Sequence, residues 1–207
     1  YPAFIVFNAV LGGQFTSRVN LNLREDKGYT YGARSYVDLQ RGPMPWVLSA
    51  AVQADKTVES LIEVRREIEE ILSARPVTAE EFEKARAGIV LRYPQSFETQ
   101  AQLAQVFGSL WVHGLPADYH ENILTRLRAL TLEEVQEAGR QILSPSGLRW
   151  VVVGGAAGLE PFLQAAGLGP PQRLQLPREA WIHILAIAGR AGIGIPAYGG
   201  GEHLPRG

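Results

Sequence analysis

The 207-residue sequence contains no cysteine, which excludes disulfide bonds, thiolate-bound zinc and a cysteine nucleophile. It contains no run of about 18 or more apolar residues, so no membrane span is expected. Lys and Arg number 20 against 21 Asp and Glu, giving a net charge of -1. Such a chain has no overall field for nucleic acid or an anionic membrane, and we expect neither as a partner. The absence of cysteine fits a cytoplasmic protein, although a periplasmic protein can also lack it.

Several catalytic motifs are also missing. None of the four histidines belongs to a His-x-x-Glu-His or His-Glu-x-x-His motif, and no serine lies in Gly-x-Ser-x-Gly. His113, Asp118 and His120 lie close together in sequence, but a zinc site there needs a third protein ligand that the spacing does not indicate. A polar loop is the simpler interpretation. The sequence therefore predicts no metal or cofactor site within this chain.

Hydrophobic periodicity predicts an α+β fold in which helices cover an antiparallel sheet. An apolar helical pattern over residues 3–11 is interrupted at Gly12-Gly13 and resumes with Phe15, Val19 and Leu23 on one face. Gly28 follows as a helix end, and two strands are predicted over residues 29–40 and 46–54, joined by a turn.

The second half reads as a series of helices followed by a strand. Thr-x-x-Glu capping boxes at Thr78 and Thr131 begin two helices, and Pro94 is expected to kink or stop the first of them. A buried strand is predicted over residues 147–155. We divide the chain into a domain over residues 1–169 and a Gly-rich tail over residues 170–207, in which the apolar run 181–189 could pack within this chain or bind to another chain.

Residues 23–36, LREDKGYTYGARSY, end a predicted helix and start a predicted strand. Arg24 near a helix C-terminus is favoured by the helix dipole, and alternating tyrosines are typical of sheet packing, so both have a structural explanation. The same pair also has chemical use. A guanidinium and a phenol are hydrogen-bond donors that could bind a peptide carbonyl or a developing oxyanion.

Residues 8–36 resemble the second-half domains of the pitrilysin/insulinase-like (inverzincin) zinc metallopeptidases, a group that includes the mitochondrial processing peptidases. The resemblance lies in Leu11-Gly12-Gly13, Ser17-Arg18, Leu23-Arg24-Glu25, and a tyrosine, Tyr31, seven residues after Arg24. It extends over roughly residues 3–169. It implies a metallohydrolase domain of the LuxS/mitochondrial processing peptidase-like fold, whose opening strand is expected before residue 1.

In that family two related halves close around a peptide, and one half carries His-x-x-Glu-His and the zinc. The resemblance therefore implies that this chain is the other half, with no cofactor of its own and zinc in a partner half. That partner is expected in the same longer chain or as the other subunit of a heterodimer. The implied site residues are Arg24, which binds substrate backbone, and Tyr31, which donates to the scissile carbonyl. The chain alone is expected to cut nothing.

A second interpretation is a non-catalytic structural or assembly subunit of the same fold, such as the core subunits of respiratory cytochrome bc complexes. A scaffold has no need of the Arg24 and Tyr31 pair, which favours the peptidase interpretation. A small-molecule enzyme is a third option, for which the sequence offers no site residues.

Overall fold

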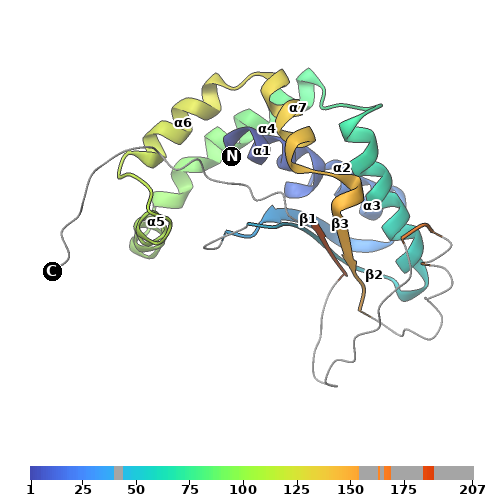
Figure 1. Cartoon of the computed structure of the whole chain (residues 1–207). Coiled ribbons are helices and arrows are strands. Elements are labelled where there is room, and N and C mark those ends of the chain that lie inside the picture. Colours follow the sequence, from blue (N-terminus) through green and yellow to red (C-terminus); the bar gives the residue numbers. More distant parts are fainter. Residues whose placement is uncertain (40–43, 154–162, 164–165, 169–183, 189–207) are drawn as a thin grey trace.

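The computed structural model describes residues 1–39, 44–153, 163, 166–168 and the backbone of 184–188 (Figure 1). The N-terminal part consists of α1 (Pro2–Asn8), η1 (Ala9–Gly13), α2 (Arg18–Asn20), η2 (Leu21–Asp26), β1 (Thr30–Val37) and β2 (Trp46–Val52). The rest consists of η3 (Ala54–Lys56), α3 (Thr57–Leu72), α4 (Ala79–Arg92), η4 (Tyr93–Phe97), α5 (Gln100–His113), α6 (Tyr119–Ala129), α7 (Leu132–Ile142), η5 (Pro145–Gly147), β3 (Leu148–Val151) and β4 (Ile184–Ala188).

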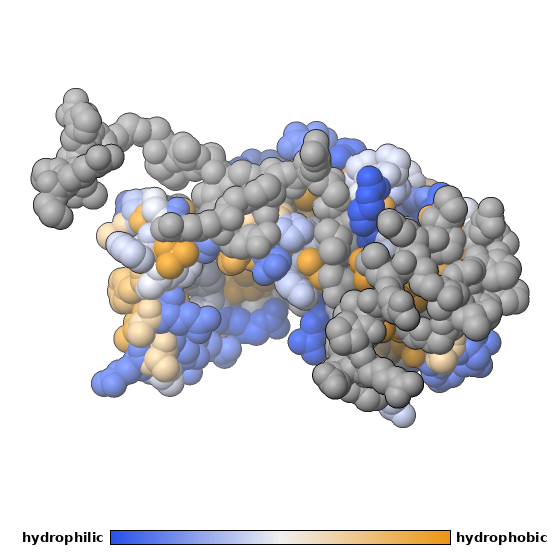
Figure 2. Space-filling view, turned by 60° about the horizontal axis from the view of Figure 1, so that its bottom comes forward, coloured by the Kyte–Doolittle hydropathy of each residue, from blue (hydrophilic) through white to orange (hydrophobic). Residues whose placement is uncertain are grey.

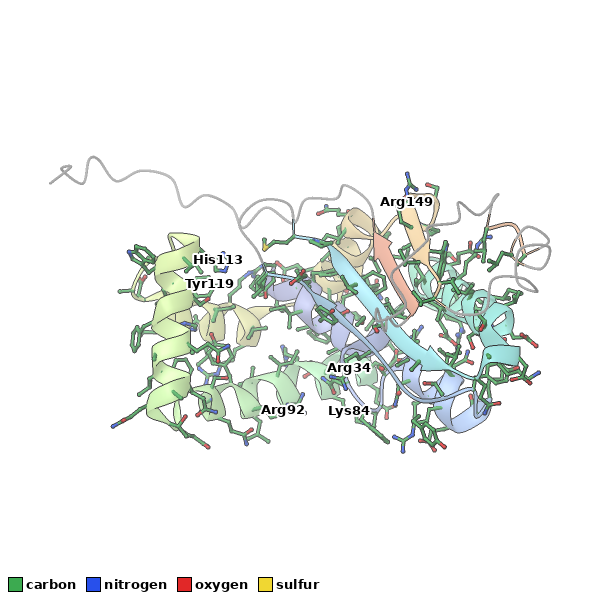
Figure 3. The ribbon with its side chains drawn as sticks, turned by 90° about the horizontal axis from the view of Figure 1, so that it is seen from below. Arg34, Lys84, Arg92, His113, Tyr119 and Arg149 are labelled. Carbon is green, nitrogen blue, oxygen red and sulfur yellow. The ribbon has the colours of Figure 1, made fainter. Side chains whose placement is uncertain are left out.

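The described strands form one antiparallel sheet in the order β1-β2-β4-β3. Strand β1 therefore lies at one edge and β3 at the other. The helices lie over one face of this sheet, and the opposite face is seen in front when the molecule is viewed from below (Figures 1 and 3). This is the α+β architecture that the sequence predicts, and the prediction is confirmed.

The hydrophobic core lies between the sheet and the first helical segments. Trp46 and Leu48 of β2 are buried in the same core as Phe4, Phe7 and Leu11 from α1 and η1. Helix α7 packs on α1 from the other side, so α1 and η1 lie between the sheet and the outer helices. This central position explains why the first 26 residues are so apolar and why η2 is held directly over β1.

Local signals in the sequence predict several boundaries correctly. Thr78 and Thr131 form the two predicted capping boxes, with Glu81 and Glu134 as their partners. Gly28 has a φ of 65°, the left-handed conformation that ends a helix without a Cβ clash. Helix α4 ends at Arg92, immediately before the turn that contains Pro94. A third capping box, Thr99 with Gln102, begins α5 and was not predicted.

The predicted position of Phe15 on an apolar helix face is wrong. The helical pattern does not resume directly after Gly13, because Gln14 is extended (φ -132°, ψ 163°) and the next helix begins at Arg18. Phe15 therefore lies in a turn, and its side chain is 62% exposed. Only Val19 and Leu23 of the predicted face are buried.

Strand β4 lies inside the segment that the sequence analysis assigns to a Gly-rich tail. Its backbone pairs with both β2 and β3, with Leu48 opposite Ala186 and Trp150 opposite Ala186 from the other side. The other residues of the segment 170–207 lie outside the described part of the chain, and the division at residue 170 stays a prediction. Within the described residues, no helix combines the length and apolarity needed to cross a membrane.

Candidate functional site

Arg24 lies in the last turn of η2 and reaches the surface. Its side chain is 37% exposed, and its Nε lies 3.5 Å from Oε1 of the neighbouring Glu25. Its Cζ lies 4.5 Å from the centre of the Phe15 ring, a cation–π geometry that sets the plane of the guanidinium. Arg24 is thus supported on one face by an aromatic ring while its N–H groups remain accessible to a ligand.

Hydrogen bonds to α3 hold η2, the helical segment that carries Arg24. Asn22 Nδ2 donates to Glu67 Oε1 at 2.7 Å and to Glu63 Oε2 at 2.9 Å. Glu67 is 4% exposed and also accepts from Arg75 at 2.9 Å, so this buried carboxylate is paired. Both η1 and η2 have the wide π-helical turn, which is frequent at functional sites.

Tyr31 lies on β1, at an irregularity of the edge strand. The pairing with β2 shifts register between Thr30 and Ala33, so Tyr31 and Gly32 form a bulge. Thr30 Oγ1 supports this bulge: it donates to Ala51 O at 2.6 Å and accepts from the Gly32 N–H at 3.1 Å. The Tyr31 side chain is 99% exposed, so the bulge presents a phenol to solvent.

Sequence reasoning selected Arg24 and Tyr31 but missed the groups that support them. Phe15 was placed on an apolar helix face, and Asn20 was not singled out at all. One feature of the sequence could have predicted the exposure of Phe15. It lies just after Gly12-Gly13, and a side chain that follows a helix interruption need not point into the core. No local spacing in the sequence indicates Asn20, because its side chain forms hydrogen bonds with backbone groups outside its own helix.

The histidines between α5 and α6 have structural partners. His120 Nδ1 lies 2.6 Å from the Tyr93 hydroxyl, and its ring packs edge-on against Phe97 and Tyr119. Burial lowers the pKa of His120 and raises the pKa of Tyr93 to about 12, so both groups are neutral at pH 7. His113 and Tyr119 lie at the same end of α5 (Figure 3).

The described residues do not fit a metal ion. Among them, no group of three or more His, Asp or Glu side chains is arranged to hold one.

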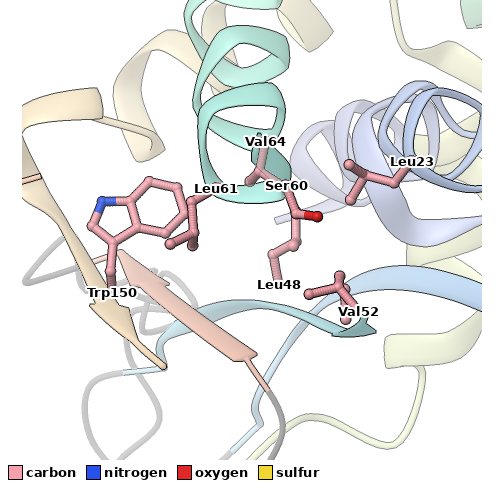
Figure 4. A pocket seen from close by; sticks show the side chains of 8 residues that line it. Leu23, Leu48, Val52, Ser60, Leu61, Val64 and Trp150 are labelled. Atoms are coloured by element: carbon pink, nitrogen blue, oxygen red, sulfur yellow. The ribbon is translucent and has the colours of Figure 1, made fainter. Parts of the chain in front are cut away.

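An apolar pocket lies between α3 and the sheet, lined by Leu23, Leu48, Val52, Leu61, Val64 and Trp150 (Figure 4). The hydroxyl of Ser60, which also lines it, already donates to Lys56 O at 2.7 Å. The pocket thus offers no free polar group to a ligand, and we interpret it as a packing gap beneath the helix that carries Arg24.

The sheet and the helices that cover it match those of the domains that the sequence resembles. Residues 1–89 match the family model described as the peptidase M16 inactive domain. A comparison with curated proteins gave no match. The predicted resemblance to the inactive, C-terminal type of domain of the M16, or pitrilysin, family is nevertheless confirmed.

Solved structures agree with this assignment. The peptidase M16 inactive domain from Pseudomonas fluorescens is 25% identical, with a TM-score of 0.63 over 70% of this chain and 34% of that one. A protease from Helicobacter pylori is 16% identical (TM-score 0.59, 68% and 33% covered) and shares the fold. So does a protein from Bordetella pertussis named as a zinc protease (20% identical, TM-score 0.57, 67% and 78% covered). The chain thus spans about a third of the length of the first two.

Proposed function

We propose that this domain is the substrate-binding and transition-state-stabilising half of a zinc-dependent endopeptidase. The metal-bearing half is a second domain of the same longer chain or a separate subunit. The observation that carries the proposal is the placement of the two motif residues. A guanidinium and a phenol, seven positions apart, both reach the surface on elements that side-chain hydrogen bonds hold in place. The M16 match over residues 1–89 supports it.

The two groups have different roles in this proposal. The Arg24 guanidinium binds carbonyl oxygens of the substrate backbone beside the scissile bond. The Tyr31 phenol donates a hydrogen bond to the scissile carbonyl oxygen, and this bond strengthens as negative charge develops there. The metal-bearing half supplies zinc and the water that attacks, so this domain is inactive without it.

The test is a peptidase assay on the chain assembled with a metal-bearing M16 half. Tyr31→Phe removes one hydroxyl, and we expect kcat to fall by about 100-fold to 1000-fold, as for the loss of one oxyanion donor, with KM and zinc content unchanged. Tyr36→Phe is the matched control, because Tyr36 is a second exposed tyrosine (44%) on the same strand. We expect Tyr36→Phe to retain wild-type kcat.

Arg24→Ala tests the second role. We expect KM to rise about tenfold or more, the effect of losing a charged hydrogen bond, with a smaller effect on kcat. Arg149→Ala is the control, since Arg149 is an exposed arginine on β3, at the opposite edge of the sheet (Figure 3). Wild-type kinetics in both Tyr31→Phe and Arg24→Ala would contradict the catalytic proposal and leave the structural-subunit interpretation.

A further inference from the structure

We propose that Asn20 is a positioning residue that holds Arg24 and Tyr31 in place through the two ends of one buried side-chain amide. This inference rests on the proposed function, because it concerns the same two site residues. Asn20 ends α2 and is 3% exposed. Its amide joins the turn before α2 to strand β1, and each of these segments supports one of the two site residues.

The amide oxygen holds the bulge that presents Tyr31. Asn20 Oδ1 accepts a hydrogen bond from the Ala33 backbone N–H at 2.9 Å. Ala33 is the residue at which β1 regains its register with β2, and it is 6% exposed. Among the described strands only β2 pairs with β1, and the Asn20 side chain binds the Ala33 N–H. Without it, a one-residue slip would turn the following side chains to the other face of the sheet.

The amide nitrogen holds the platform beneath Arg24. Asn20 Nδ2 donates to the backbone carbonyl of Phe15 at 2.7 Å. Phe15 lies in the turn between η1 and α2, and its ring contacts the Arg24 guanidinium from one side. A ring that is 62% exposed has little packing of its own, so the Asn20 contact restrains the turn together with the hydrogen bond from the Ser17 N–H to Gln14 O.

Only one orientation of the amide satisfies both contacts. Its oxygen faces an N–H and its nitrogen faces a carbonyl; a flipped amide would place donor against donor and acceptor against acceptor. Because the group is buried, water cannot replace either partner at low cost. The Asn20 side chain therefore links the Phe15 turn to the Tyr31 bulge, in addition to the contacts that η1 and α2 make with β1.

Two substitutions separate the two contacts. Asn20→Asp keeps the acceptor for Ala33 but loses the donor to Phe15, so we expect KM to rise as in Arg24→Ala while kcat stays within about twofold of wild type. Asn20→Ala loses both contacts, and we expect KM to rise and kcat also to fall, by about tenfold to 100-fold for a misplaced group. Phe15→Leu, which removes only the aromatic face, should raise KM alone.

A second readout does not depend on the partner half. In the full chain without a partner, amide hydrogen exchange at Ala33 should become at least about tenfold faster in Asn20→Ala, and should stay slow in Asn20→Asp. Gln136→Ala is the control for a general loss of stability. Gln136 Nε2 donates to Val77 O at 2.8 Å between α7 and the loop before α4, far in sequence from both site segments.

The possible results are distinguishable. Unchanged Ala33 exchange in Asn20→Ala, or wild-type kinetics in Asn20→Ala when Tyr31→Phe is slow, overturns the positioning role. Wild-type kinetics in both Tyr31→Phe and Arg24→Ala overturns the proposed function instead. If Asn20→Ala does not fold, the KM values of Asn20→Asp and Phe15→Leu test the positioning role instead. An unchanged KM in both variants counts against the proposal.

Discussion

Gly12 allows the helical backbone of η1 to lie directly on strand β1. A Cβ at this position would lie 2.4 Å from Ser35 Oγ and 3.0 Å from Ser35 Cβ. The close approach is fixed by a buried network, because Ser35 Oγ donates to Asn8 Oδ1 at 2.6 Å and Trp46 Nε1 donates to the same oxygen at 2.6 Å. Gly12 thus has a packing role, at the base of the segment that leads to Phe15 and Arg24.

We expect Gly12→Ala to lower the free energy of unfolding by about 1–3 kcal/mol, the usual effect of forcing an extra carbon into a packed core. Gly108→Ala is the matched control, because Gly108 lies on α5 and a Cβ there meets nothing within 4 Å. In that open helical position alanine should stabilise by about 0.5–1 kcal/mol. Urea unfolding measures both changes, and equal midpoints for the two variants would contradict this account.

At the scale of elements, Arg18 ties the start of α2 to the start of α4. Its Nε lies 2.7 Å from Glu81 Oε1 and its second terminal nitrogen 2.6 Å from Glu81 Oε2, a bidentate pair. Glu81 also accepts from the Thr78 backbone N–H at 2.9 Å as part of the capping box. One carboxylate therefore both caps α4 and pairs with an arginine next to the site segment.

This pair makes stability depend on pH. Burial opposes ionisation of Glu81, but the hydrogen bonds from Arg18 and Thr78 outweigh it and lower its pKa below 4.5. A carboxylate whose pKa is lower in the folded state stabilises the protein above its unfolded pKa, and this contribution is lost as the pH falls through the folded value. The effect is moderate, since the Glu81 side chain is 32% exposed.

We expect Glu81→Gln to be less stable by about 1–2 kcal/mol at pH 7, and to lose less stability than the wild type between about pH 5.5 and 3. The measurement is the free energy of unfolding over that pH range. Glu80→Gln, one position earlier on the same turn, is the control and should follow the wild-type curve. Parallel curves for Glu81→Gln and the wild type would show that the pair contributes no pH dependence.

The elements that sequence reasoning found are those whose signals are local. Thr78 with Glu81, Gly28 and Pro94 act within one turn of chain, so their spacing alone predicts a boundary. The bulge at Tyr31 was not predicted, because it depends on Asn20, a side chain from another element. The exposure of Phe15 was missed for a related reason. The apolar periodicity of the sequence continues past Gly13, whereas the helical backbone is interrupted there.

At the scale of the whole molecule, the sheet joins residues from distant parts of the chain. Strand β4 lies between β2 and β3, which do not pair with each other in the described sheet. Its position could not be read from the sequence, since pairing between strands more than 30 residues apart leaves no periodic signal and the surrounding run is rich in glycine. The apolar run 181–189 was noted only as able to pack.

Helix α5 leaves large apolar side chains exposed at one side of the molecule (Figure 2). Phe107 is 58% exposed and Trp111 is 81% exposed, and only Leu110 of this helix is fully buried. Helix α5 thus contacts mainly its neighbour η4. It contributes little to the core between the sheet and the helices. We expect the stability of the sheet, in contrast, to depend on the pairing of β4 with both of its neighbours.

Two truncations test that dependence. A chain that ends after residue 188 keeps β4, whereas one that ends after residue 183 loses the strand that pairs with both β2 and β3. At about 0.5–1.5 kcal/mol for each ladder hydrogen bond, the shorter chain should lose at least about 3 kcal/mol, or roughly 6–12 °C in Tm. Thermal unfolding followed by circular dichroism compares the two chains, and tryptophan fluorescence reports on Trp150, which pairs with Ala186. If both melt at the same temperature, β4 is not part of the cooperative sheet, and β3 must be held by its contacts with the helices alone.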